Sequence, residues 1–371
     1  MRIIFAGGGT GGHIYPAVAI AKEVIEINND VEVLFIGTEK GLENKIIPIE
    51  GFPFKKIKVR GFSRKINFEN IIAIKEVLFS FIDAYRIIGD FKPDIVVGTG
   101  GYVCGSMLLT ASLMGIPTLI HEQNAFPGVT NRILSRFVDK IALTFPEASK
   151  YLSQQEKIRV TGNPLRSDIT KISSIEGKEF FSFDTSIPLL FIVGGSRGAK
   201  KINESSMMLA KECLDKKEYQ ILHMTGETQY DDVLKTYADL GISLDTKYMK
   251  VMPYIHDMSY ALAAADLVIS RCGAGLISEI TALGKPSILI PYPYAADNHQ
   301  EYNARALEKS GAANVILERD LNQQTLLSEV KNLFQNPNYM KEMSAQSKKL
   351  GKPNATREIV EMINELFKRK K

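Results

Sequence analysis

The chain has few of the side chains that build structural metal sites or disulfide frameworks. Its 371 residues include three cysteines, which stand far apart at positions 104, 213 and 272. Neither a disulfide framework nor a zinc motif uses such spacing, and scattered cysteines are typical of a reducing compartment. No Asp-x-Asp pair stands near the glycine-rich segments described below. We therefore expect no required metal and no cofactor.

We expect neither a signal peptide nor a membrane-spanning run. The chain begins with a short apolar run that is typical of a strand, not with a basic and then apolar leader. Residues 95–120 have no charged side chain and are long enough to span a bilayer, for which about 20 residues suffice. Five glycines and one proline interrupt this run, however, and indicate buried parallel strands joined by turns. We expect a cytoplasmic protein.

Charge is unevenly distributed, although the net charge is only +4. Residues 55–75 contain seven basic side chains and one acidic one, so this stretch carries +6 and the rest of the chain −2. Arg64, Lys65 and Phe68 lie in it, and the apolar residues of 71–82 follow. A surface that is both basic and apolar favours binding to anionic lipid. The alternative is that one side of a helix here packs on a sheet.

Short apolar runs alternate with helical patterns through both halves of the chain. In the first half we predict strands at 2–6, 31–36, 95–97, 118–121, 140–143 and 157–160, and helices at 16–27, 68–88, 105–113 and 129–137. In the second half we predict strands at 188–193, 220–224, 251–252, 267–270, 287–290 and 314–316. The alternation predicts an α/β protein with two doubly wound Rossmann-like domains facing across a cleft. We expect domains at 1–163 and 164–340, with a C-terminal helical segment, about 341–371, that packs back on the first.

Two glycine-rich loops stand at the heads of the two halves. Residues 7–12 read Gly-Gly-Gly-Thr-Gly-Gly, and residues 194–198 read Gly-Gly-Ser-Arg-Gly. Each follows an apolar run and precedes a helical pattern. Glycines let backbone N–H groups approach an anion closely, and the N-terminus of the next helix adds a positive dipole end. Two such loops predict phosphate binding on both walls of the cleft.

The first loop also contains the pattern Gly-x-Gly-x-x-Gly, and Glu39 follows the second predicted strand. This combination fits a nicotinamide- or flavin-binding domain, in which the acid binds a ribose. That interpretation gives no role to the second glycine loop. His13 follows the first loop directly, where the helix dipole favours a neutral imidazole suited to act as a general base. The alternative for His13 is local capping or packing.

Polar residues follow several other predicted strands, at the edge where α/β sheets bind ligands. These segments are 121–124 (His-Glu-Gln-Asn), 271–279 (strand, glycine turn, helix) and 291–300. Arg166 follows a Gly-Asn-Pro-Leu turn, and a planar guanidinium at this place is able to bind a diphosphate. The competing interpretations are solvated loops, an ion pair for Arg166, and stabilisation of a helix N-terminus by Glu279.

Taken together, these motifs resemble those of the MurG family, the peptidoglycan N-acetylglucosaminyltransferases with the two-domain GT-B fold. Segments 8–13, 121–124, 162–166, 194–196, 273–279 and 297–300 occur in the order seen in that family. The resemblance extends from Met1 to about Arg357. It implies inverting transfer of N-acetylglucosamine from UDP-GlcNAc to the C4 hydroxyl of the muramoyl sugar of lipid I, which gives lipid II. No nucleic-acid partner is expected.

The resemblance also implies roles for individual residues. His13 is the expected catalytic base, and Glu122 is the second candidate. Uracil would be bound at Ile255, the ribose by Glu279, and the diphosphate by Ser196, Arg166 and the turn at 274–278. The full set of expected substrate-binding residues is Thr10, Gly11, Gly12, Asn124, Arg166, Ser196, Tyr254, Ile255, Ala274, Gly275, Leu276, Ile277, Ser278, Glu279 and Gln300. Of these, Asn124, Gln300 and the loop 10–12 would reach the transferred sugar or the acceptor.

The family acts on a lipid-linked acceptor, which implies peripheral attachment to anionic lipids on the cytoplasmic face of the membrane.

The chain departs from the family pattern at Leu276, where Thr or Ser is usual, and at Tyr254, where Phe is common. Two alternatives share its features. A UDP-GlcNAc 2-epimerase of the same fold should carry acidic residues in the cleft, and a non-catalytic nucleotide-sugar sensor would differ only in turnover.

Overall fold

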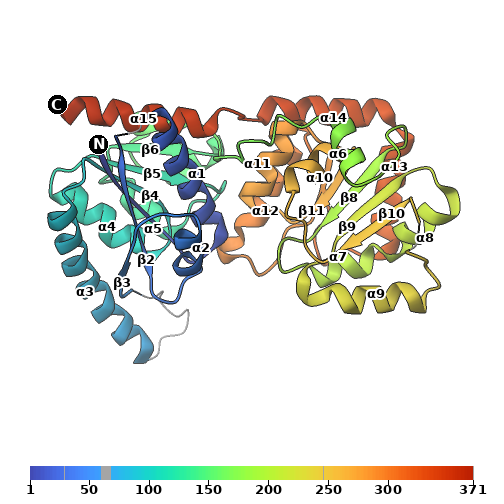
Figure 1. Cartoon of the computed structure of the whole chain (residues 1–371), viewed down its shortest axis with the longest axis horizontal. Coiled ribbons are helices and arrows are strands. Elements are labelled where there is room, and N and C mark those ends of the chain that lie inside the picture. The colour runs from blue at the N-terminus through green and yellow to red at the C-terminus, as the bar shows by residue number, and fades with distance from the viewer. Residues whose placement is uncertain (29, 60–67, 245, 371) are drawn as a thin grey trace. The chain divides into compact units, whose positions relative to one another are not determined.

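The computed structural model describes residues 1–28, 30–59, 68–244 and 246–370, with the backbone alone at 68–74 and 370. The chain divides into two compact units. Unit 1 comprises Met1–Leu165 and Asn354–Lys371, and unit 2 comprises Arg166–Pro353. Each unit contains one parallel sheet with helices on its faces (Figure 1). The prediction of two doubly wound α/β domains is therefore confirmed.

The described residues of unit 1 contain seven parallel strands in the order β3-β2-β1-β4-β5-β6-β7. The strands are β1 (Arg2–Gly7), β2 (Glu32–Thr38), β3 (Phe54–Ile57), β4 (Ile95–Gly100), β5 (Thr118–Glu122), β6 (Lys140–Leu143) and β7 (Ile158–Val160). The helices are α1 (Gly11–Ile27), α2 (Glu43–Ile49), α3 (Phe68–Phe91), α4 (Tyr102–Leu113), α5 (Val129–Leu134) and α15 (Ala355–Lys370). Ile3 and Phe5 of β1 face one core and Ile4 faces the other, because side chains alternate along a strand. Helices α1 and α15 cover the first face, and α3 and α4 cover the second.

The last helix of the chain belongs to unit 1. Helix α15 packs beside α1 (Figure 1), and Glu365 pairs with Lys140 and Arg159. The hydrogen bond from Lys140, with that from Arg159, lowers the pKa of the Glu365 carboxyl. The preceding helix α14 (Pro337–Leu350) packs instead on α11 (Ala274–Leu283) of unit 2. The segment 341–371 is thus divided between the two units.

The described residues of unit 2 form a six-stranded parallel sheet in the order β10-β9-β8-β11-β12-β13. The strands are β8 (Leu189–Val193), β9 (Gln220–Met224), β10 (Met249–Met252), β11 (Leu267–Ser270), β12 (Ser287–Leu289) and β13 (Asn314–Val315). The other helices are α6 (Ser174–Phe180), α7 (Lys200–Ser205), α8 (Met207–Lys216), α9 (Tyr230–Asp239), α10 (Met258–Ala264), α12 (His299–Lys309) and α13 (Gln323–Gln335). Short 3₁₀ turns connect some of these elements in both units.

Two elements of unit 1 were missed, and two helices start earlier than predicted: α1, and α4, which begins at Tyr102 and not at Gly105. Strand β3 lies at the edge of the sheet, where its exposed Lys55 and Lys56 protect an open edge and hide the strand pattern. Helix α2 was also missed. Helix α1 begins at Gly11 and not at Pro16, so His13 lies in its first turn. Because glycine destabilises helix interiors, Gly11 and Gly12 were predicted to belong to the loop and not to the helix.

The uncharged run at 95–120 folds as β4, α4 and the beginning of β5. Most of α4 is buried in the core, including Cys104, Met107 and Leu108. Over the part of the chain that the structure describes, no helix has both the length and the apolar character needed to cross a membrane.

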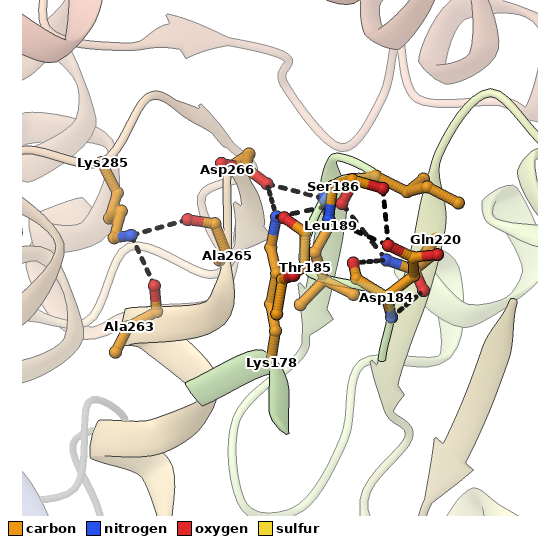
Figure 2. A network of polar contacts seen from close by, with 11 residues as sticks. Lys178, Asp184, Thr185, Ser186, Leu189, Gln220, Ala263, Ala265, Asp266 and Lys285 are labelled. Carbon is orange, nitrogen blue, oxygen red and sulfur yellow. Dashed lines mark hydrogen bonds and ion pairs between the residues drawn. The ribbon is translucent and has the colours of Figure 1, made fainter. Parts of the chain in front are cut away.

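A polar network closes the amino edge of the unit 2 sheet (Figure 2). The buried Lys178 ammonium is 2.9 Å from Asp266 Oδ2 and donates to the carbonyl of Ile187 at 2.9 Å. Asp266 also accepts from the N–H of Leu189, the first residue of β8, at 2.8 Å. The network therefore ties the start of β8 to the segment that leads into β11, on the edge opposite the loops described below.

Lys285 completes this edge. Its ammonium donates to the carbonyls of Ala263 and Ala265 at the C-terminal end of α10, both at 2.7 Å (Figure 2). A cation at this position complements the negative end of the helix dipole. Burial nevertheless lowers the pKa of the Lys285 ammonium to about 8, against the opposing effect of Asp266.

The lowered pKa of Lys285 predicts a pH-dependent stability. Between about pH 8 and 10.5 the unfolded chain binds a proton at this position that the folded chain has released. The free energy of unfolding should therefore rise with pH, by at most about 1.4 kcal/mol per pH unit from this group. Lys285→Met should remove that contribution, which urea unfolding of the full chain across this range measures. Lys349→Met, at an exposed lysine, is the control; equal slopes for the native chain and Lys285→Met would contradict the assignment.

Candidate functional site

Both sheets change direction of winding beside their first strand. Strand β1 lies between β2 and β4, and β8 lies between β9 and β11. The winding changes between β1 and β4, and between β8 and β11, so the loops that leave the two strands of each pair run to opposite faces of the sheet. Open α/β sheets bind ligands in the crevice between such loops. Each predicted site residue stands at or after the carboxyl end of a strand in its own unit, except Arg166, which begins unit 2.

His13 is the best-defined candidate in unit 1. Its Nδ1 lies 2.8 Å from the carbonyl oxygen of Gly8. Because a carbonyl only accepts, Nδ1 carries a proton, so the tautomer compatible with this contact has its lone pair on Nε2. The ring lies against Gly100, which has a φ of +115° and where a Cβ would come within 2.8 Å of Nε2. Glycine at the end of β4 is thus required by both the backbone and the imidazole.

Glu43 is a residue that the sequence analysis missed. It begins α2 and is fully buried. Its Oε2 accepts from the N–H of Gly9 at 2.9 Å, and its Oε1 accepts from the N–H and hydroxyl of Thr38, both at 2.8 Å. Glu39, proposed as a ribose ligand in a nicotinamide-binding domain, is exposed. The chain's own carboxylate occupies the Gly9 amide of the first glycine loop, which disfavours that alternative.

Glu122 ends β5 and is buried in contacts with its own loop. One carboxylate oxygen accepts from the N–H of Asn124 at 2.9 Å. The other accepts from the N–H of Gly128 at 3.1 Å and from the side-chain amide of Asn131 at 2.8 Å. These bonds hold the loop in shape and place the half-buried Asn124 at its turn. Asn131, another residue missed from sequence, takes part through its amide.

Hydrogen bonds of the buried His121 also hold this loop. Burial lowers the pKa of His121 to about 4, so its ring is neutral. Its Nε2 is 3.0 Å from the carbonyl of Gly162 and donates to it, and its Nδ1 accepts from Gln123 at 3.0 Å. Gln123 also donates to the carbonyl of Thr99 at 2.8 Å. This chain of bonds links β5 to β4 and to the segment after β7.

In unit 2, helix α11 begins directly after the short loop that follows β11. Within 273–283, all of it described, no side chain caps the helix and no acid occupies its first turn. The N–H groups of Ala274, Gly275 and Leu276 have no acceptor inside the helix and form an anion-binding end. The Ser278 hydroxyl donates to the carbonyl of Ala274 at 2.8 Å, and Ile277 is buried. The turn at 274–278 therefore offers backbone groups more than side chains.

Arg166 and Glu279 form an ion pair next to this helix end. The Glu279 side chain is 9% exposed, whereas that of Arg166 is 48% exposed. Burial raises the pKa of the Glu279 carboxyl, and the Arg166 guanidinium opposes the shift. The ion pair weighed as an alternative for Arg166 is thus present. It leaves much of the guanidinium open to solvent.

The second glycine loop lies against the loop after β9. Ser196 is exposed at its tip, and the N–H of Gly198 donates to the carbonyl of Gly195 at 2.8 Å. A Cβ at Gly198 would lie 2.0 Å from the carbonyl oxygen of Thr225. Backbone therefore packs directly on backbone here.

Two buried residues missed from sequence hold this arrangement. Asn203 donates to the carbonyl of Thr225 at 3.0 Å and accepts from Nε2 of His223 at 3.0 Å. Nδ1 of His223 in turn accepts from the Tyr237 hydroxyl at 2.9 Å. Burial lowers the pKa of His223 to about 3, so this ring also stays neutral.

The remaining predicted residues occupy two further loops of unit 2. Ile255 is buried after β10, and the half-buried ring of Tyr254 stands 4.9 Å from that of His256. The carboxamide oxygen of Gln300 accepts from the N–H of Cys272 at 3.2 Å and from that of Tyr292 at 3.0 Å. Gln300 thus ties the loop after β11 to the loop after β12.

The chain matches two family models and many curated relatives. Glycosyltransferase family 28 N-terminal domain matches residues 3–143, and glycosyltransferase family 28 C-terminal domain matches residues 189–359. A relative from Caldanaerobacter subterraneus is 48% identical over 363 residues, which cover 98% of this chain and 99% of the relative. One from Acetivibrio thermocellus is 48% identical over 370 residues, which cover 100% and 99%. Both are named UDP-N-acetylglucosamine--N-acetylmuramyl-(pentapeptide) pyrophosphoryl-undecaprenol N-acetylglucosamine transferase.

Solved structures of two kinds share this fold but differ in their sequence identity to the chain. Acinetobacter baumannii MurG superposes with a TM-score of 0.79 at 30% identity, over 98% of this chain and 99% of its own. A UDP-GlcNAc 2-epimerase from Neisseria meningitidis, bound to UDP-GlcNAc, reaches 0.70 at 16% identity, over 98% and 100%. The second likeness shows the fold alone, so the epimerase alternative is not favoured. The prediction of a GT-B fold is confirmed, and the chain belongs to the MurG family of N-acetylglucosaminyltransferases within glycosyltransferase family 28.

Proposed function

We propose that this protein transfers N-acetylglucosamine from UDP-GlcNAc to the C4 hydroxyl of the muramoyl sugar of lipid I, giving lipid II and UDP. The observation that carries the proposal is the near-half identity, along the whole chain, to transferases named for this reaction. The domain roles follow the predicted site residues: unit 1 receives the acceptor, and unit 2 binds UDP-GlcNAc.

Unit 2 supplies the groups that a nucleotide sugar requires. The free N–H groups of α11, the exposed Ser196 and the open part of the Arg166 guanidinium would bind the diphosphate. Glu279 would accept from the ribose hydroxyls, and the backbone of Ile255, with Tyr254 beside it, would address the uracil. Gln300, whose carboxamide oxygen is engaged, would donate through its amide nitrogen to the sugar. These donors stabilise the charge that develops on the leaving diphosphate, and the proposal assigns no role to a metal.

Glu279→Ala should weaken binding of UDP-GlcNAc by about 1–3 kcal/mol, the range for loss of a charge-assisted hydrogen bond. Isothermal calorimetry measures this directly. Glu279→Gln, which keeps an acceptor, should lose less. Glu308→Ala, which removes a surface pair with Arg305 on α12, is the control. Unchanged affinity in Glu279→Ala would rule out the ribose assignment.

Unit 1 supplies the base. In the proposed step the acceptor O4 attacks the anomeric carbon and gives its proton to Nε2 of His13. The bond from that carbon to the diphosphate breaks with inversion, and UDP leaves with the electron pair. Asn124 and the loop 10–12 would contact the acceptor or the transferred sugar. Glu122 remains the second candidate base, but its hydrogen bonds to three neighbours favour a role in holding the loop.

His13→Ala should lower kcat by about 10²–10⁴-fold, the usual contribution of a general base. The affinity for UDP-GlcNAc should stay the same, because the donor is assigned to unit 2. Turnover of a soluble lipid I analogue and calorimetry together test this. If His13→Ala keeps near-native kcat while Glu122→Gln loses it, the two residues exchange roles.

We further propose peripheral attachment to anionic lipids of the cytoplasmic face of the membrane, through unit 1. The predicted Arg64 and Lys65 lie outside the described residues, as do the side chains of 68–74. Among the described residues, a cavity of about 580 Å³ beside α3 is lined by four basic side chains, Lys55, Lys56, Lys58 and Arg86, and by three acidic ones, Glu39, Glu76 and Asp83. Four apolar or aromatic side chains of α3 are between 47% and 62% exposed: Leu78, Phe79, Ile82 and Tyr85. An exposed apolar helix next to basic side chains suits the interface of a bilayer.

Changing Lys55 and Lys56 together to Glu should reduce sedimentation with anionic vesicles sharply, since each basic residue near such a surface contributes on the order of 1 kcal/mol. Raised salt should weaken binding of the native chain. The same charge change at the exposed Lys211 and Lys235 of unit 2 is the matched control. Equal vesicle binding by both double variants would contradict the proposed surface.

A further inference from the structure

Glu43 occupies a position that three glycines create. A Cβ at Gly8, Gly37 or Gly41 would lie within 2.4 Å of an atom of its side chain. The carboxylate is fully buried, and it accepts from the backbone of Gly9 and from both donors of Thr38. It is therefore too enclosed to contact a substrate. Its hydrogen bonds instead determine the shape of the first glycine loop.

One peptide group connects Glu43 to His13. The N–H of Gly9 donates to Glu43, and the carbonyl of Gly8, in the same peptide plane, accepts from Nδ1 of His13. In a trans peptide these two groups point in opposite directions. Rotation of this peptide would break both hydrogen bonds together. The carboxylate on one side thus fixes the direction of the carbonyl on the other.

The same connection has an electrostatic consequence. A carboxylate that accepts from a peptide N–H polarises that peptide and makes its carbonyl a stronger acceptor. A stronger bond to Nδ1–H holds the imidazole in the tautomer with a free lone pair on Nε2, as carboxylates do for histidines in other sites. Here the carboxylate would act through a peptide, without contact to the ring.

We propose that Glu43 is a positioning residue for His13, which it orients through the Gly8–Gly9 peptide. This inference rests on the proposed role of His13 as the base. Glu43→Gln tests it, because an amide offers one acceptor and one donor where the native carboxylate accepts on both oxygens. Either Gly9 or Thr38 would then face a second donor, and the peptide would lose its fixed direction.

Glu43→Gln should lower kcat by about 10- to 100-fold, the range seen when groups that orient a ligating histidine are removed. The Kd for UDP-GlcNAc and the KM for a lipid I analogue should stay within about twofold of the native values. Glu50→Gln, the same change at the C-terminal end of α2, is the control and should leave kcat unchanged. In the His13→Ala background, Glu43→Gln should cause no further loss, since its effect passes through the imidazole.

The tautomer of the His13 ring can be measured without measuring turnover, and it tests the proposal independently. The chain has five histidines, so selective ¹⁵N labelling yields few ring signals, and His13→Ala identifies those of His13. The native protein should show Nδ1 protonated and Nε2 free. Glu43→Gln should shift this population toward the tautomer with Nε2 protonated. An unchanged tautomer in a folded Glu43→Gln protein would overturn the proposal.

Thr38 provides a second test if Glu43→Gln fails to fold. Thr38→Val removes the hydroxyl donor to Glu43 with little change of shape, and Thr38→Ser keeps it. Thr38→Val should lower kcat and mix the tautomers, whereas Thr38→Ser should not. If Thr38→Val lowers kcat by the same factor in the His13→Ala background as in the native chain, the proposal is also overturned. If His13→Ala keeps native kcat, His13 is not the base. The tautomer of His13 in Glu43→Gln still tests whether Glu43 orients the ring.

Discussion

Direct packing of backbone on backbone at the carboxyl edges of the two sheets is the constraint on which the rest depends. In unit 1, a Cβ at Gly101 would lie 2.7 Å from the carbonyl oxygen of Gly8. In unit 2, a Cβ at Gly226 would lie 2.2 Å from the backbone nitrogen of Gly198. All four glycines follow the carboxyl ends of strands that are neighbours in their sheet, and three of them have positive φ, which L side chains rarely adopt. Glycine therefore brings polar backbone groups to the points where α/β sheets bind ligands.

The carboxylates near these loops have different kinds of hydrogen-bond partner in the two units. In unit 1, Glu43 accepts from the N–H of Gly9 in the first glycine loop, and Glu122 accepts from backbone and amide donors of its own loop. In unit 2, Glu279 faces an arginine beside an uncapped helix N-terminus. Under the proposed function, neutral donors serve the unit that takes a proton from the acceptor hydroxyl. A guanidinium and a helix dipole serve the unit proposed to bind the diphosphate.

Buried strands and glycine turns could be predicted because their signal is local. The apolar run of β8 is followed by Gly194 and Gly195, and the pattern located both the strand and the loop. Contacts between distant segments gave no local signal. Glu39 and Glu43 both follow β2, and only the packing of Gly8 and Gly41 around the second shows which acid enters the loop. Asn203 and His223 likewise appeared as ordinary helix and strand residues until the fold joined them by a direct hydrogen bond.

The sequence by itself determined the α/β class, the two-domain organisation, the family and the loops that carry the candidate site, because periodicity and glycine-rich motifs act over a few residues. Tertiary structure alone decided how those loops are held. It buried Glu122 among donors, paired Arg166 with Glu279, and placed the Gly8–Gly9 peptide between Glu43 and His13. The physical reason is that hydrogen-bond partners are chosen by distance in space. Glu43 and Gly9, which lie far apart along the chain, meet only because β1 and β2 are neighbours in the sheet.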